Sequence, residues 1–278
     1  MRTEKVVVLP YNKAWKSAFE DNRREIECTL GERTLGVAHV GSTAVEALSA
    51  KPCIQAVIFD MYETLVTQFE SPLYYGTQIA QDLGLAPEAF LPGWRATEEA
   101  RATGKQTFEA VMEMLLRQHG IYTPERHRQV VEKRTAIQAD CFTHLHPGIL
   151  PMLRGLKERG IQIGLITNCF SEEARLIRES ELFPYFDAPC LSWEVGVRKP
   201  DPAIYHHCTG KLGIPPENCL YVGDGGSREL ETARDLGMQA VQATWYRKPE
   251  FESLQAAIRR DFPQISDPME WKRNASLK

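Results

Sequence analysis

Residues 55–67 read QAVIFDMYETLVT, a short apolar run that ends at Phe59 and is followed at once by Asp60. A run of this length and composition is typical of a buried strand. In parallel sheets, ligands bind at the carboxyl ends of the strands. The stretch therefore predicts a strand over 55–59 whose carboxyl end presents a functional acid, Asp60.

The segment after Pro147 alternates between short apolar runs and helical patterns. Further strands are expected at 161–166, 188–191, 219–222 and 239–243, and helices at 148–159, 171–180, 202–212, 227–236 and 251–260. This alternation predicts an α/β fold, a Rossmann-like parallel sheet with helices on both faces. Residues 70–146 look mostly helical and contain no strong strand candidate, which predicts an all-helical insertion into the α/β core.

Polar side chains end three of the predicted strands or follow them. Strand 161–166 is followed by Thr167-Asn168, and strand 219–222 by Gly223-Asp224-Gly225-Gly226. Lys199 lies in the loop VRKPDPAIY, which two prolines stiffen. A carboxylate, a hydroxyl, a lysine and a second acidic loop are thus expected to meet at one edge of the sheet.

Four segments carry a family resemblance. IFDMYETLV, LITNCF, VRKPDPAIY and YVGDGGSREL resemble, in order, the four motifs of the haloacid dehalogenase-like (HAD) hydrolases. The resemblance covers about residues 55–262. It implies a core formed by 55–68 and 147–268, with a helical cap at 69–146.

The resemblance also implies roles for the residues at the predicted edge. Asp60 would be the nucleophile that forms a covalent aspartyl intermediate. Thr167 would hold substrate oxygens and Lys199 would neutralise negative charge. The implied substrate-binding residues are Tyr62, Thr167, Asn168 and Lys199. The implied Mg²⁺ ligands are Asp60, the backbone carbonyl of Tyr62, Asp224 and, as an outer ligand where the family usually has Asp, Glu229.

Tyr62 departs from the pattern of the family's phosphatases, which mostly have an acid-donating Asp two positions after the nucleophile. A tyrosine there is similar to the 2-haloacid dehalogenases, whose halide leaves without a proton and which work without metal. Glu63 is adjacent, but neighbouring residues of an extended segment point in opposite directions. We therefore expect Glu63 to replace only a turn residue.

The acids of the fourth motif favour a phosphatase. Asp60, Asp224 and Glu229 would repel one another, and one would take up a proton unless a cation compensates their charge. We therefore expect Mg²⁺ and hydrolysis of a small phosphorylated metabolite through an aspartyl-phosphate on Asp60. The alternatives are a metal-independent 2-haloacid dehalogenase, or a decayed site on a binding module.

Residues 1–54 resemble a different family. VVVLPYNKAWKSAFEDNRREI and AHVGSTAVEALSAKP are similar to the start of the GrpB family, whose fold resembles nucleotidyltransferases. Gly41-Ser42 could hold a nucleotide phosphate, but Gln55 and Val57 stand where metal-binding carboxylates are expected. We interpret 1–54 as a partial, catalytically inactive extension that begins with a helix over 12–30 and could mediate a homodimer.

The composition of the chain argues against some classes of binding partner and indicates a cellular compartment. The chain has 278 residues, with 33 basic and 37 acidic side chains and a net charge of −4, which argues against nucleic acid or an anionic membrane as the main partner. No apolar stretch approaches a membrane span. Seven cysteines without a CxxC pair suggest reduced thiols and a cytoplasmic protein.

Two further groups of polar residues could have a role. Arg95 and Arg101, close to Trp94, are candidates for anion contacts in the cap, although charged helix faces usually just face water. His144-Leu145-His146 is expected to be a linker where the cap returns to the core.

Overall fold

The computed structural model describes residues 14–30 and 54–273. The chain divides into two units, Met1–Cys53 and Ile54–Lys278. In the first unit, α1 (Ala14–Leu30) is the helix expected over 12–30, and an ion pair between Arg23 and Glu27, one turn apart at 2.9 Å, supports it. Gly41-Ser42 and most of the GrpB-like segment lie outside the described residues.

The second unit is built on a six-stranded sheet in which every strand pair is parallel. The strands are β1 (Ala56–Phe59), β2 (Gln162–Thr167), β3 (Ala188–Leu191), β4 (Cys219–Gly223), β5 (Gln239–Ala243) and β6 (Gln264–Ile265). Their spatial order is β3-β2-β1-β4-β5-β6. The α/β, Rossmann-like prediction is confirmed, and β6 is a short edge strand that was not expected.

Helices cover both faces of this sheet, so its strands are mostly apolar. Val57 and Phe59 of β1 pack with α7 (Ile149–Glu158) and α8 (Ser171–Glu179). Ala56 and Ile58 point to the opposite face and pack with α10 (Pro202–Leu212) and α11 (Glu229–Asp235). This two-fold alternation, with all four β1 residues buried, explains why the strand reads as a continuous apolar run.

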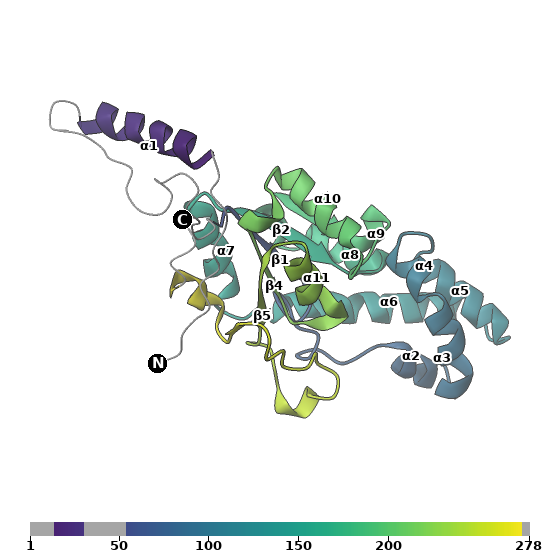
Figure 1. The fold of residues 1–278 in the computed structure, drawn as a ribbon. Coiled ribbons are helices and arrows are strands. Elements are labelled where there is room, and N and C mark those ends of the chain that lie inside the picture. Colours follow the sequence, from purple (N-terminus) through teal and green to yellow (C-terminus); the bar gives the residue numbers. More distant parts are fainter. Residues whose placement is uncertain (1–13, 31–53, 274–278) are drawn as a thin grey trace. The chain divides into compact units, whose positions relative to one another are not determined.

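The helices between β1 and β2 form a separate hydrophobic cluster. They are α2 (Gly76–Asp82), α3 (Pro87–Ala96), α4 (Glu98–Ala102), α5 (Phe108–Gln118) and α6 (Pro124–Asp140). Phe90, Phe108 and Leu115 are among the fully buried members of their cluster. Figure 1 shows α2 to α5 to one side of the sheet, with the long α6 running back toward it. We call residues 69–146 the helical insert.

Two predicted helices differ from the structure. The segment 227–236 begins with a 3-10 turn at Gly226–Arg228 before α11. The helix expected over 251–260 is wrong: a 3-10 turn at Pro249–Phe251 is followed by turns and irregular backbone. The backbone there bonds to side chains instead, because Gln242 donates to the Ala257 carbonyl at 2.9 Å and accepts from the Arg259 N–H at 2.8 Å.

The segment His144–His146 connects a 3-10 turn at Cys141–Thr143 to α7. His146 is fixed locally, since its backbone N–H donates to Tyr246 Oη at 2.7 Å and its ring accepts from Gly148 N–H at 3.1 Å. Among the described helices, none has the length and apolar character needed to cross a membrane. The homodimer and the cytoplasmic location stay predictions.

Candidate active site

The strand order of the sheet brings Asp60 and Asp224 to the ends of two neighbouring strands. Strands β1 and β4 are neighbours, with Phe59 opposite Val222, although they lie far apart in the sequence. Asp60 follows β1 and Asp224 follows β4. From this point the strand order runs outward in opposite directions, and such a switch point opens a crevice at the carboxyl ends of the strands.

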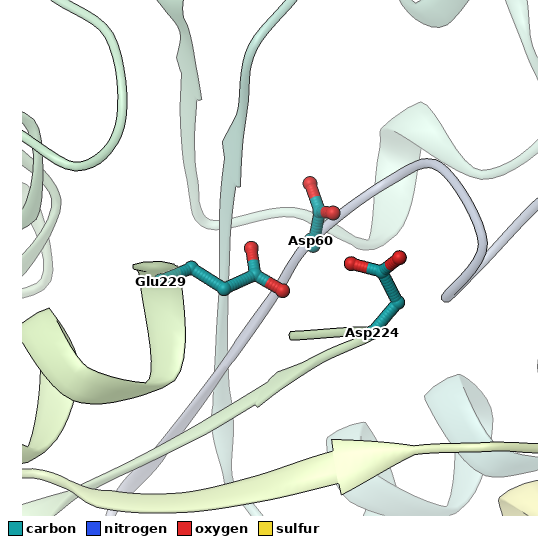
Figure 2. Close-up of side chains that lie close together, drawn as sticks. All are labelled: Asp60, Asp224 and Glu229. Atoms are coloured by element: carbon teal, nitrogen blue, oxygen red, sulfur yellow. The ribbon is translucent and has the colours of Figure 1, made fainter. Parts of the chain in front are cut away.

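Three carboxylates meet in this crevice. Figure 2 shows the side chains of Asp60, Asp224 and Glu229 pointing toward one another. One oxygen from each lies within 4.8 Å of the others. Asp60 is 7% exposed and Glu229 is fully buried. Asp60 is fixed through its backbone, because its N–H donates to the Val222 carbonyl at 2.9 Å.

Lys199 is the cation at the centre of the cluster. Its Nζ lies 2.6 Å from Asp60 Oδ1 and 2.5 Å from Glu229 Oε2, and its side chain is buried. Burial alone would lower the pKa of Lys199, but the charges of Asp60 and Glu229 raise it above its ordinary value. The lysine is therefore held as an ammonium ion against both acids.

Asn168 holds the loop that carries Lys199. Its Oδ1 accepts from the Lys199 backbone N–H at 2.8 Å, and its Nδ2 donates to the Lys199 carbonyl at 3.2 Å. The side chain expected to bind substrate is thus used for positioning. Thr167, which ends β2, is fully buried, and its hydroxyl makes a long 3.4 Å hydrogen bond to the Asn168 carbonyl.

Glu229 is the most fully bonded of the three acids. It accepts hydrogen bonds from Tyr221 Oη at 2.8 Å and from the Gly225 N–H at 3.0 Å, in addition to the ion pair with Lys199. It begins α11, where the helix dipole favours a negative charge. Its longer side chain crosses Gly223, where an added Cβ would overlap Oε1 and lie 2.6 Å from Cδ. The glycine therefore leaves space for the acid.

The charges of the cluster do not balance. If all three acids are ionised, one lysine faces three carboxylates. Burial, together with the charge of Glu229, raises the pKa of Asp60 to about 6 despite the ion pair with Lys199. Burial and the charges of Glu229 and Asp60 raise the pKa of Asp224 well above its usual range. Such a set of oxygen donors with excess negative charge fits a hard divalent cation such as Mg²⁺.

Glu63 and Tyr62, which follow Asp60 in the motif, differ in how their side chains are bonded. Glu63 has a left-handed backbone with φ of 56°, and its carboxylate accepts from Thr67 Oγ1 and from the Gln68 N–H, both at 2.8 Å. It closes a turn, as expected from the sequence. The Tyr62 hydroxyl is buried without a hydrogen-bond partner among the described residues. Its surroundings include Glu173, Cys169 and Arg134, and burial raises its pKa well above the usual value.

Ion pairs connect the helical insert to the core around this site. Arg134 of α6 reaches Glu172 at 3.2 Å and Glu173 at 2.6 Å, both in the first turn of α8. Arg198, next to Lys199, pairs with Glu98 at 2.9 Å and Glu99 at 3.1 Å in α4. Sequence analysis missed these residues, because each pair joins elements far apart in the chain. The adjacent acidic residues at 98–99 and at 172–173 were the sequence feature that could have indicated these ion pairs.

The comparisons with known proteins agree with this geometry. A family model described as haloacid dehalogenase-like hydrolase matches residues 54–237. A glyceraldehyde 3-phosphate phosphatase of Methanopyrus kandleri is 30% identical over 129 residues, which are 45% of this chain and 54% of that protein. A phosphoserine phosphatase of Thermus thermophilus is 29% identical over 128 residues, 46% of this chain and 51% of that one. This chain thus spans about half the length of these curated relatives.

A solved structure has the same fold. A HAD family enzyme from Bacteroides thetaiotaomicron, solved in complex with magnesium and inorganic phosphate, superposes with a TM-score of 0.56 at 16% identity, covering 70% of this chain and 97% of the other. At 16% identity, this similarity shows a shared fold and nothing more. The family model, which covers well over half of the chain and includes Asp60, Lys199 and Asp224, carries the assignment. The chain belongs to the haloacid dehalogenase-like hydrolases.

Proposed function

We propose that this protein is a Mg²⁺-dependent phosphatase that hydrolyses a small phosphorylated metabolite through an aspartyl-phosphate on Asp60. The observation that carries the proposal is the buried Asp60–Lys199 pair at 2.6 Å inside a cluster with two further acids. A 2-haloacid dehalogenase of this family would need the nucleophile and the lysine, but not the excess of carboxylates. The phosphatase names of the relatives point the same way.

Each residue has a part in this proposal. The Asp60 carboxylate attacks phosphorus, a P–O bond forms, and the bond to the leaving group breaks, so that an alkoxide departs and takes up a proton from water. Lys199 offsets the charge of the nucleophile and the phosphoryl oxygens, and Thr167 and nearby backbone N–H groups hold those oxygens. Water then cleaves the aspartyl-phosphate. The helical insert would act as a cap that excludes bulk water during the first step.

Asp60, the Tyr62 carbonyl and Asp224 would hold the metal, with Glu229 as an outer ligand. When bound, Mg²⁺ supplies positive charge that favours binding of the phosphate dianion. These residues fit Mg²⁺ because Asp60, Asp224 and Glu229 bring carboxylate oxygens together with excess negative charge. The magnesium and phosphate bound by the Bacteroides enzyme support the proposal for this fold. Since Tyr62 stands where the family's phosphatases mostly have an acid-donating Asp, we expect esters with good leaving groups to be preferred.

The test uses an activated aryl phosphate and 2-chloropropionate, each with Mg²⁺ and with EDTA. Wild type should release phosphate only with Mg²⁺, and Asp60→Asn should lose this activity. Asp235→Asn changes an exposed aspartate of α11 and is the matched control, which should keep wild-type activity. Chloride release that survives EDTA would replace the phosphatase with a dehalogenase. Magnesium binding without turnover of either substrate would favour a decayed binding module.

A further inference from the structure

Two stretches of backbone join the helical insert to the core. The first connection, residues 64–68, follows closely after Asp60, and the second connection, residues 144–148, leads into α7. An insert moves relative to its core by backbone rotations in a few residues at its ends. A side chain that binds both connections at once therefore restrains where the insert lies.

Tyr246 binds both connections with one hydroxyl group. Its Oη accepts a hydrogen bond from the His146 backbone N–H at 2.7 Å and donates one to the Leu65 carbonyl at 3.2 Å. The side chain is buried, and burial raises the pKa of Tyr246 to about 12, so the hydroxyl keeps the proton that it donates. The rings of His146 and Tyr246 also pack nearly perpendicular to each other, with centroids 6.2 Å apart.

The neighbours of Tyr246 bind the same side of the insert. Trp245 donates from Nε1 to the Thr64 carbonyl, in the first connection, at 2.9 Å. Lys248 Nζ lies 2.5 Å from Glu70 Oε1, at the start of the insert. Residues 245–248, which follow β5, therefore attach the first connection to the sheet at several points, and Tyr246 alone among them also bonds to the second connection.

Tyr246 is linked to the acids of the candidate active site in two ways. The Leu65 N–H donates to the carbonyl of Met61, the residue after Asp60, at 2.8 Å. The residue whose carbonyl Tyr246 holds is thus bonded to the turn that carries Asp60. Tyr246 and Asp224 also line the same small cavity. A movement of the first connection is therefore passed on to the active site.

We propose that Tyr246 is a positioning residue that holds the helical insert against the core, and the turn after Asp60 in place, by binding both connections of the insert. Phenylalanine at this position could neither donate to Leu65 nor accept from His146, so both hydrogen bonds would be lost while the ring stays. The insert would then separate from the core more often. The effect on catalysis rests on the proposed phosphatase activity, whereas the restraint on the insert does not.

Amide hydrogen exchange at two residues of α5 tests the restraint. The Phe108 N–H donates to Ser171 Oγ of α8 at 2.9 Å, so its exchange reports separation of the insert from the core. Leu115 lies later in the same helix and is fully buried in the hydrophobic cluster of the insert, so its exchange reports unfolding of the insert itself. The ratio of the two exchange rates thus distinguishes separation from a general loss of stability.

Tyr246→Phe should raise the exchange rate of the Phe108 amide about 10-fold relative to that of Leu115. Tyr74→Phe is the matched control and should leave the ratio unchanged, because it removes a buried hydroxyl whose 2.9 Å bond to Asp82 stays within the insert. Trp245→Phe, which releases only the first connection, should raise the ratio by a smaller factor, and it decides the question if Tyr246→Phe does not fold. An unchanged ratio in these two connection variants would overturn the proposal.

The kinetic readout is hydrolysis of the aryl phosphate with Mg²⁺. Tyr246→Phe should lower kcat several-fold with little change in KM, because the turn after Asp60 loses a bond that keeps the attacking carboxylate aligned. Tyr74→Phe should keep the wild-type kcat. A raised exchange ratio with unchanged kcat would overturn the positioning role. If wild type hydrolyses no phosphate, the phosphatase is overturned, and the exchange ratio still decides whether Tyr246 restrains the insert.

Discussion

Replacing Lys199 by Met should destabilise the protein by several kcal/mol, and Mg²⁺ should reverse much of the loss. Lys199 is buried and forms two ion pairs, at 2.6 Å and 2.5 Å, with Asp60 and Glu229. Removing one partner of a buried ion pair costs about 3–5 kcal/mol, because the remaining charge is left uncompensated. Here the remaining charge belongs to three carboxylates, so we expect the loss at pH 8 to fall in that range.

The control is Lys157→Met. Lys157 pairs with Asp187 at a similar distance, 2.6 Å, but the two side chains are 38% and 33% exposed. Exposed pairs contribute about 0–1 kcal/mol, because water and salt screen them. The two variants thus remove the same chemical group from pairs of equal length and different burial.

Urea unfolding at pH 8 measures both variants, with EDTA and with Mg²⁺. A ligand at 100 times its Kd stabilises the folded state by about 2.7 kcal/mol, so Mg²⁺ should bring Lys199→Met most of the way back to the stability of wild type in EDTA. It should do little for the difference between Lys157→Met and wild type. If Lys199→Met in EDTA is as stable as Lys157→Met, the lysine does not compensate the buried acids and our reasoning about the cluster is wrong.

Three further predictions concern the same region. Gly223→Ala should lower the free energy of unfolding by about 1–3 kcal/mol in urea, because its Cβ would overlap the fixed Glu229 carboxylate; an unchanged midpoint would show that Glu229 moves freely. Tyr221→Phe should cost about 2 kcal/mol in the same assay, since it removes the 2.8 Å hydrogen bond to Glu229, and a neutral result would contradict that bond. Burial raises the pKa of Glu173 from 4.5 to about 7, so the folded state holds this proton more tightly than the unfolded state. The contribution of Glu173 to stability is therefore full below pH 4.5 and is lost as the pH rises through 7. The free energy of unfolding of wild type, relative to that of Glu173→Gln, should fall by about 2–3 kcal/mol from pH 5 to pH 8. A difference between the two proteins that does not change with pH would refute the raised pKa.

The strands and the acids could be predicted because their signals are local. β1, β3 and β5 were expected within one residue, since buried parallel strands are short apolar runs between polar turns. Asp60 and Asp224 end such runs, so the topology brings them together without further information. The predicted convergence of Asp60, Lys199, Asp224 and Glu229 matches the geometry observed, although their chemical roles stay predictions.

The remaining features depend on contacts that no local pattern encodes. Arg101 reads as a charge on a helix face, and it is buried because Trp94 and the distant Phe170 enclose it. The helix expected over 251–260 fails because Gln242, on β5, bonds to its backbone. The direction of the Tyr62 hydroxyl depends on how the insert packs against α8. Such contacts are set by tertiary structure, which overrides local propensity.

The central place of β1 has a consequence for biosynthesis. It is the first strand of the sheet to be made, but its neighbours are β2 and β4, which end at residues 167 and 223. At about 5–20 residues per second, the 223 − 59 = 164 residues from the end of β1 to that of β4 take roughly 8–33 s to synthesise. During this interval β1, an apolar strand, lacks at least one of the two neighbours that pair with its edges. The helical insert is made during that interval and has a hydrophobic cluster of its own, so it can fold while the strand that bears Asp60 still awaits its partners.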